Sequence, residues 1–195
     1  MNNPLIHINR KEEQTMLLKV ILSLFFIFMT ILEIFLYPEA IPIDKGISYF
    51  GNLHLESGNP NHFAIIFIMK IIISSILMIY IGVISKDYIL LSLGVIISLV
   101  AFPYDTYPVI HDIGALFSYL LMMMIVISKI ILIRKRSDSL EVKYKLYFYV
   151  FVMIVMVLIM IFNFVNEAYV IPIFDEYSLV YQILYLFLFF GILIF

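Results

Sequence analysis

Residues 60–85 read PNHFAIIFIMKIIISSILMIYIGVIS, and Lys70 is the only charged residue among them. A helix needs about 17–25 predominantly apolar residues to cross the hydrocarbon of a bilayer, at about 1.5 Å of rise per residue. The stretch is long enough and apolar enough for that. It therefore predicts a transmembrane helix and makes the membrane the first candidate solvent for the whole chain.

The composition of the whole chain agrees with this interpretation. The 195 residues are 64% hydrophobic and 13% charged, with a mean hydropathy of +1.10. A soluble globular domain carries about 45–50% apolar and about 25% charged residues. We therefore predict a small integral membrane protein, forming one domain over residues 1–195.

Several function classes are excluded at this level. The chain has no cysteine, which rules out disulfides, thiolate metal sites, iron–sulfur clusters and a cysteine nucleophile. The net charge is −2 and there is no polybasic tract, so no nucleic-acid partner is expected. Membrane lipids are the expected partners, and the oligomeric state is not readable from the sequence.

The apolar pattern predicts an all-α bundle of six transmembrane helices. The third helix is short because Pro103 and Pro108 bracket a segment in which a helix cannot continue. Asn59 before Pro60 is typical of a helix start, as is Pro108, and Asp138 with Glu141 has the spacing of a capping box. The predicted helices span residues 16–37, 60–85, 87–102, 108–133, 140–165 and 177–195.

Basic residues separate sharply between the two sets of loops. Ten of the twelve lysines and arginines lie on one side of the predicted bundle. Lys45 lies in a loop on the other side, and Lys70 lies inside a span. By the positive-inside rule both termini are then cytoplasmic, in a multi-pass protein of the cell membrane. The basic residues on the inner side are Arg10, Lys11, Lys19, Lys86, Lys129, Arg134, Lys135, Arg136, Lys143 and Lys145.

Ionisable residues within spans are costly and mark function by default. Lys70 lies ten residues into its predicted helix, near mid-membrane, and Ser74 shares its face at i+4. Because an isolated charge costs about 2.5–3.5 kcal/mol even on the insertion scale, we expect Lys70 to pair with Glu33 or with Glu167. The alternative to a functional role is that such a pair only fixes helix packing.

The remaining polar residues of the spans lie in the outer half, which predicts a polar cavity open to the outside and lined by the first, second, fourth, fifth and sixth helices. The inner half of the spans consists mainly of aliphatic residues, phenylalanine and methionine. The candidate ligand-binding residues are Glu33, His62, Lys70, Ser74, His111, Asn163, Asn166 and Glu167.

The segment His111-Asp-Ile-Gly-Ala-x-x-Ser118 places His111, Gly114 or Ala115, and Ser118 on one helical face. Its small residues permit close approach of another backbone. His111 is a candidate general base, metal ligand or contact to a lipid phosphate. The alternative is a polar helix-end group bonded to a loop carbonyl.

Catalytic and metal sites have weaker signals. The catalytic candidates are His111, Asp112 and Glu167, and the weak metal candidates are His54, His62 and His111 with Asp105, Asp112 or Glu167. No two histidines have a known metal-motif spacing, and a Gly-x-Ser-x-Gly elbow is missing. We therefore predict no cofactor and favour a protein that is not an enzyme.

Three motifs carry a family resemblance: Ile47-Ser-Tyr-Phe-Gly-Asn52, the Ala-Phe-Pro-Tyr-Asp105 end of the third helix, and His111-Asp-Ile-Gly-Ala115. With these motifs the chain resembles the six-helix membrane proteins of the DRAM, Frag and Sfk group and a related prokaryotic family, chiefly from the first to the fourth helix. The resemblance implies cytoplasmic termini and roles around membrane lipids, with His111 and residues 47–52 as the positions to carry over. The charge at Lys70 and an outer loop without the usual Ser-Asp pairing depart from that pattern.

Three functions follow as hypotheses. The first is a lipid-associated membrane protein whose outward cavity binds a lipid head group or small amphiphile. The second is an intramembrane lipid hydrolase or acyltransferase that uses His111 as its base. The third is a small secondary transporter, which would need access from both faces of the membrane.

Overall fold

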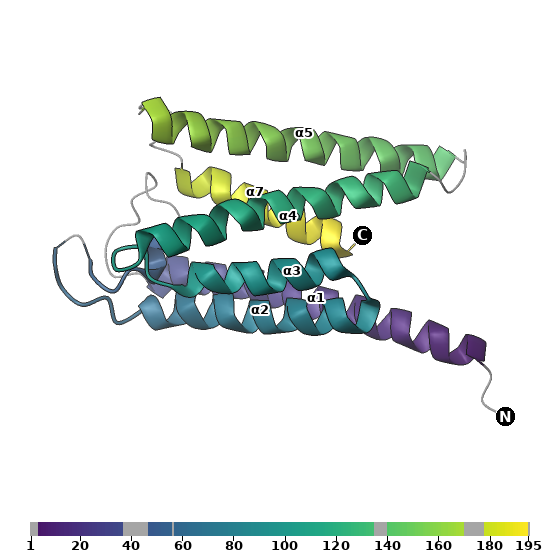
Figure 1. Ribbon diagram of the computed structural model, residues 1–195, viewed down its shortest axis with the longest axis horizontal. Coiled ribbons are helices and arrows are strands. Elements are labelled where there is room, and N and C mark those ends of the chain that lie inside the picture. The colour runs from purple at the N-terminus through teal and green to yellow at the C-terminus, as the bar shows by residue number, and fades with distance from the viewer. Residues whose placement is uncertain (1–3, 37–46, 56, 135–139, 170–177, 195) are drawn as a thin grey trace.

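The computed structural model describes residues 4–36, 47–55, 57–134, 140–169 and 178–194, of which residues 4–10, 163–169, 178, 179 and 181 are described by their backbone alone. Figure 1 shows long helices running side by side in one bundle. The α-helices are α1 (Pro4–Leu36), α2 (Ala64–Ser85), α3 (Tyr88–Ile97), α4 (Pro108–Arg134), α5 (Leu140–Tyr169) and α7 (Ser178–Ile194), and the 3-10 helices are η1 (Ile47–Gly51) and η2 (Ser98–Ala101).

The helices pack as a ring in chain order. Each of α1 to α5 contacts the next, and α7 closes the ring because it lies against both α5 and α1. One end of the bundle, the loop end, carries η1 and the loop segments 52–55, 57–63 and 102–107. The opposite end, the hairpin end, carries the α2–α3 turn, the start of α1 and the ends of α4 and α7 (Figure 1).

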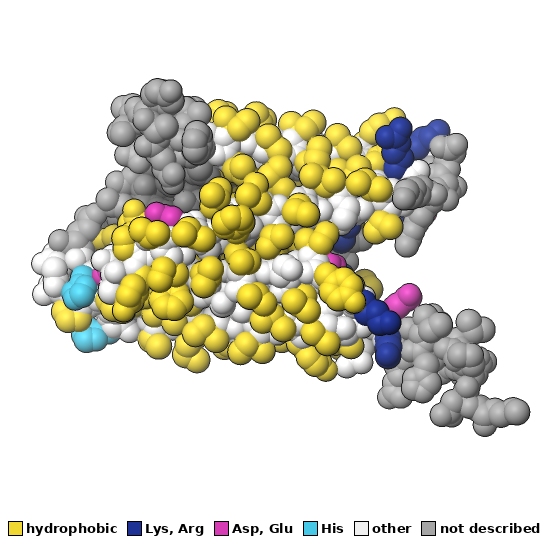
Figure 2. All heavy atoms as spheres, viewed as in Figure 1, with side chains coloured by type: hydrophobic (Ala, Val, Ile, Leu, Met, Phe, Trp, Pro, Cys, Tyr) yellow, Lys and Arg dark blue, Asp and Glu magenta, His cyan; other side chains and the backbone are white. Residues whose placement is uncertain are grey.

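Four described helices are long and apolar enough to cross a membrane, as expected of an α-helical membrane protein. They supply the candidate spans Lys11–Leu36, Ala64–Ser85, Pro108–Arg134 and Leu140–Phe162, whereas Tyr88–Ala101 and Gln182–Ile194 are shorter apolar helices. Figure 2 shows hydrophobic side chains covering the flank of the bundle, with basic side chains gathered at the hairpin end.

The start of α2 differs from the prediction. Asn59 and Pro60 do not begin the helix; α2 begins at Ala64, and its preceding residue makes no side-chain cap. The reason is a competing structure, in which Pro60 forms a β-bridge with His54 and the Asn61 side chain accepts a 3.1 Å hydrogen bond from the Phe63 N–H. Polar side chains that bond to nearby backbone groups favour turns over helix interiors.

The other boundaries agree more closely, apart from that of α1. This helix begins at Pro4, well before the predicted Met16, because a helix can continue past the membrane-length apolar run. The third helix stops early as predicted, giving way to the 3-10 turn η2 before Pro103. The capping box at Asp138 lies outside the described residues.

The helices α2 and α3 form a closely packed hairpin. Lys86 adopts a left-handed backbone with φ of 57°, and the Asp87 carboxylate accepts a 3.1 Å hydrogen bond from the Leu90 N–H at the start of α3. A Cβ atom at Gly94 would lie 2.8 Å from the Ile79 backbone nitrogen, so the two helices touch backbone to backbone there. The Ser75 hydroxyl donates a 2.6 Å hydrogen bond to the Gly94 carbonyl across the same contact.

Candidate functional site

Lys70 and Glu33 form an ion pair in the interior of the bundle. The Lys70 Nζ lies 2.5 Å from Glu33 Oε2, and the two side chains are 0% and 2% exposed. The predicted pairing of α1 with α2 through these residues is therefore present in the structure. The alternative partner, Glu167, belongs to the residues whose side chains the structure does not describe.

Aromatic rings complete the surroundings of the ammonium group. The Lys70 Nζ lies 4.9 Å from the ring centroid of Phe26 and 4.8 Å from that of Phe67, within cation–π range. It also approaches the hydroxyl of Thr30 at 3.5 Å. A buried charge requires compensation of this kind, and such pairs tend to specify an arrangement more than they add stability.

A cavity of about 160 Å³ lies beside this pair toward the loop end. Its walls come from α1, η1, α2, the α3–η2 segment, α4 and α7, whereas none of the described residues of α5 lines it. The predicted wall from the fifth helix depends on residues 163–167, whose side chains lie outside the described part of the chain. The third helix contributes a wall that was not predicted. The polar residues that line the cavity are Ser48, Lys70, His111, Asp112, Ser118 and Gln182.

His111 is held rigidly at the edge of this cavity. It is buried, and its Nδ1 lies 2.8 Å from the carbonyl oxygen of Phe102. Because a carbonyl only accepts, Nδ1 must donate, which places the free lone pair of a neutral ring on Nε2. The prediction of a helix-end histidine bonded to a loop carbonyl is confirmed, and the second nitrogen keeps its capacity to accept a hydrogen bond or a proton.

The predicted small-residue face of α4 is also present. His111, Gly114 and Ser118 are all buried on this helix. A Cβ atom at Gly114 would lie 2.7 Å from the Leu99 Cβ and 3.1 Å from the Val100 backbone nitrogen, so η2 packs directly on α4 at this point. The break in the third helix and the glycine on the fourth thus place the Phe102 carbonyl within reach of His111.

Ser118 lines the cavity from the predicted small-residue face of α4, but it was not among the predicted ligand-binding residues. It is buried, and its hydroxyl has no hydrogen-bond partner among the described residues. Leaving a buried hydroxyl unbonded costs about 1–3 kcal/mol, so it is a natural contact for a bound group. Its spacing of seven residues from His111, two helical turns on one face, was the signal that could have found it.

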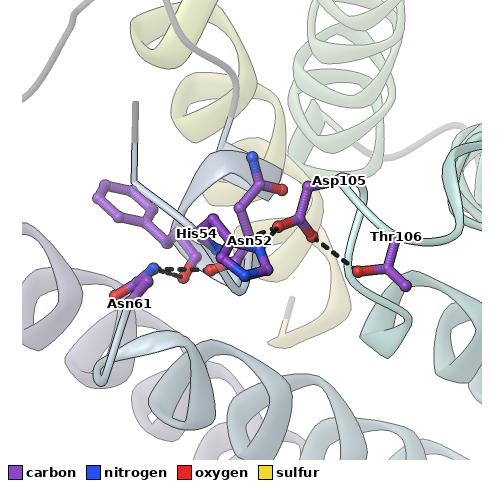
Figure 3. Close-up of polar contacts among 6 residues, drawn as sticks. Asn52, His54, Asn61, Asp105 and Thr106 are labelled. Atoms are coloured by element: carbon purple, nitrogen blue, oxygen red, sulfur yellow. Dashed lines mark hydrogen bonds and ion pairs between the residues drawn. The ribbon is translucent and has the colours of Figure 1, made fainter. Parts of the chain in front are cut away.

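A polar network closes the loop end of the bundle (Figure 3). The Asn61 side-chain amide donates to the carbonyls of Phe50 and Asn52 at 3.2 and 2.9 Å. Asp105 accepts from the His54 backbone N–H at 3.0 Å and lies 3.1 Å from its Nδ1. These contacts tie η1 and the 52–61 loop to the α3–α4 loop, next to the cavity wall formed by Ile47 and Ser48.

The electrostatics of Asp105 follow from these bonds. Partial burial raises the pKa of its carboxyl, but hydrogen bonds from the Leu53 and His54 backbone N–H groups, the His54 ring and the Thr106 hydroxyl lower it by more. The pKa of Asp105 therefore lies below its ordinary value, and the carboxylate is the stable form at neutral pH. It serves as a fixed acceptor for the loop.

The structure does not bring all the predicted site residues together. His62 is exposed in the loop before α2, and it does not line the cavity because α2 begins later than expected. Ser74 is buried one turn after Lys70 on α2. Its hydroxyl has no hydrogen-bond partner among the described residues, and it does not line the cavity. Asn163 and Asn166 lie in the part of α5 whose side chains are outside the described residues.

The weak metal candidates are separated from one another. His54 lies with Asp105, His62 is exposed in the loop, and His111 faces the cavity. Over the side chains that the structure describes, no group of three histidine, aspartate or glutamate residues is close enough to hold a metal ion.

Comparisons with known proteins found no match: no family model, no curated protein and no solved structure matches the chain. The cavity itself is therefore the basis for a functional proposal.

Proposed function

We propose that the chain crosses the membrane six times, with both termini on the cytoplasmic side and the loop end facing outward. The distribution of basic residues supports this orientation, because Lys86, Arg134 and Lys143 belong to the hairpin end. The segments Tyr88–Ala101 and Gln182–Ile194 are then the two short crossings. Reporter fusions at Lys86 and at Ser57 test the orientation, since the first must report the cytoplasm and the second the outside.

We further propose that the cavity binds the polar head group of a membrane lipid or of a small amphiphile. The observation that carries this proposal is the buried, unpartnered Ser118 hydroxyl in a cavity shared with His111 and Lys70. Apolar walls from Phe26, Phe67 and other side chains surround these few polar groups. Ligand pockets characteristically combine apolar walls with a small number of placed polar groups.

The size of the cavity limits the bound group. A volume of about 160 Å³ is close to that of the engineered apolar cavity of about 150 Å³ that binds benzene, and below the range of about 300–1,000 Å³ of drug-sized pockets. A head group or the polar tip of an amphiphile fits this space, whereas a complete lipid does not. The remainder of the ligand would extend along the bundle surface.

The charges favour a ligand that donates hydrogen bonds. The ammonium of Lys70 is already paired with Glu33, and Asp112 adds a carboxylate at the cavity wall that has no ion-pair partner among the described residues. The Nε2 of neutral His111 and the Ser118 oxygen can each accept a hydrogen bond. A hydroxyl- or ammonium-bearing head group matches these acceptors better than a bare anion.

The experiment that tests the cavity is lipid extraction and mass spectrometry of the purified protein. Binding to the wild type is compared with that of Ser118→Val and His111→Phe, which remove the two acceptors while they keep the helix. His62→Phe is the matched control, because His62 is exposed and lies outside the cavity. Loss of a co-purified hydroxyl- or amine-bearing lipid in the cavity variants alone supports the proposal, and equal lipid content in all four proteins contradicts it.

The second candidate function is a lipid hydrolase or acyltransferase with His111 as base. The observation that favours it is the tautomer, because the bond from Nδ1 to Phe102 leaves Nε2 available to take a proton. Ser118 does not serve as its nucleophile, since seven residues of helix separate the two by about 10 Å along the axis. Turnover of radiolabelled phospholipid that is abolished in His111→Phe would establish this function in place of the first.

A further inference from the structure

The hairpin end of the bundle contains a second cavity, separate from the one beside Lys70. Its volume is about 380 Å³, and it lies between one face of α1 and the last residues of α2 and α7, with one side chain from α4. The lining residues are Lys11, Glu12, Thr15, Met16, Lys19, Ile84, Ser85, Lys129, Leu193 and Ile194. We call it the lysine cavity.

Positive charge is in excess around the lysine cavity. Among the residues that the structure describes, Lys11, Lys19 and Lys129 line it, together with one carboxylate, that of Glu12. The field of Asp87 also reaches Lys19 and Lys129, but the Asp87 carboxylate is bonded to the Leu90 N–H as the cap of α3. Like charges that converge in a partly buried site are unfavourable unless an anion joins them.

The ammonium groups retain unused hydrogen-bond donors. Lys19 Nζ makes no hydrogen bond or ion pair with any residue that the structure describes, and Lys129 Nζ donates to the backbone carbonyl of Ile192, which is neutral. A lysine ammonium carries three donors. At least five donors from these two side chains, three from Lys19 and two from Lys129, therefore remain for an anionic ligand.

Part of the lining of the lysine cavity is apolar, and we call this part the apolar wall. Met16, Ile84, Leu193 and Ile194 form it, and Leu193 is buried while Met16 is exposed on the bundle surface. Because Met16 is exposed, the apolar wall reaches the surface of the bundle. A ligand that fits both the lysines and the apolar wall has an anionic head and an apolar remainder.

We propose that the lysine cavity binds the phosphate of an anionic membrane lipid. Lys19 and Lys129 donate to the phosphate oxygens, Lys11 supplies further positive potential at the rim, and the apolar wall accepts the glycerol and upper acyl carbons. Basic pockets between helix ends are suited to such head groups. Free inorganic phosphate offers the same charge without the apolar part, so it would leave the apolar wall unused.

The test is native mass spectrometry of the full-length protein in detergent, titrated with phosphatidylglycerol, with phosphatidylcholine or with inorganic phosphate. This measurement does not depend on the orientation proposed above or on the cavity beside Lys70. Each lysine is expected to contribute about fivefold to the affinity for phosphatidylglycerol, so Lys19→Gln weakens binding about fivefold and Lys19→Gln/Lys129→Gln about 25-fold. Lys143→Gln is the matched control, because Lys143 is an exposed lysine outside the cavity.

The outcomes separate the possible ligands. Preference for phosphatidylglycerol over phosphatidylcholine, lost in the Lys19 variants and kept in Lys143→Gln, supports the proposal. Lys19→Gln keeps the Lys129 bond to Ile192 intact, so its result stands even if the double variant fails to fold. Equal effects of Lys19→Gln and Lys143→Gln, or displacement of the lipid by equimolar inorganic phosphate, overturn it.

Discussion

The Lys70 ammonium lies 2.5 Å from the Glu33 carboxylate and within cation–π range of the rings of Phe26 and Phe67. This contact joins α1 to α2 at a depth where neither charge reaches solvent. The same lysine forms part of the cavity wall beside His111. The packing of the bundle and the polarity of the candidate site therefore depend on one ion pair.

Replacing one member of the Lys70–Glu33 pair should destabilise the fold more than replacing both. Lys70→Met leaves the Glu33 carboxylate buried and unpaired, and we expect a loss of about 3–5 kcal/mol in the free energy of unfolding. Lys70→Met/Glu33→Leu should recover most of that loss, because apolar side chains of similar volume replace the pair. Unfolding in mixed detergent micelles, followed by circular dichroism, measures both. A single variant as stable as the double variant would contradict the buried pairing.

Substitution of two adjacent serines on α2 by alanine should change the stability of the fold differently. Ser75→Ala removes the 2.6 Å hydrogen bond to the Gly94 carbonyl and should cost about 1 kcal/mol. Ser74→Ala removes a buried hydroxyl that has no partner among the described residues, so it should be neutral or stabilising. The same unfolding measurement compares the two, and equal destabilisation would argue against the α2–α3 contact described above.

The close approach of α2 and α3 predicts a large effect of one added methyl group. A Cβ atom at Gly94 would lie 2.8 Å from the Ile79 nitrogen and 2.9 Å from the Ser75 carbonyl oxygen, so Gly94→Ala should destabilise by about 1–3 kcal/mol. Gly191→Ala is the control, because nothing lies within 4 Å of the Cβ position there. That substitution should be neutral or stabilising by up to about 1 kcal/mol, since alanine is the better helix former.

The loop end should loosen in acid. The pKa of Asp105 is lower in the folded chain than its ordinary value, so its bonds stabilise the fold above about pH 4 and are lost as the pH falls through the folded pKa. Hydrogen exchange of residues 52–61 should therefore accelerate below about pH 4 in the wild type. Asp105→Asn should exchange faster at neutral pH and show a smaller dependence on pH, after correction for intrinsic exchange rates. An unchanged pH profile in Asp105→Asn would show that other groups control this loop.

Much of the fold was predictable because its causes are local. Long apolar runs predicted the helices, and the prolines at 103 and 108 predicted the early end of the third helix and the start of the fourth. The Glu33–Lys70 pair was predictable as one of two alternatives, since an unpaired charge in a span is so costly that a partner must exist. The spacing of His111, Gly114 and Ser118 predicted their common face.

The incorrect predictions had competing causes that lie in the tertiary structure. Asn59 and Pro60 are typical of a helix start, but the Asn61 side chain bonds to the Phe50 and Asn52 carbonyls and holds this segment as a loop. His62 is exposed as a result. Side-chain bonds of this kind, between residues nine and eleven positions apart, leave no periodic signal in the sequence.

The length of the apolar runs and the cost of a buried charge thus determined the helices and one of their connections, because the first acts along a single segment and the second imposes a strict pairing. The cavity beside His111, its wall from the third helix and the lysine cavity at the hairpin end were decided only when the helices packed. Each combines side chains from several helices, and the space between them depends on close contacts such as that of Gly114 with Leu99.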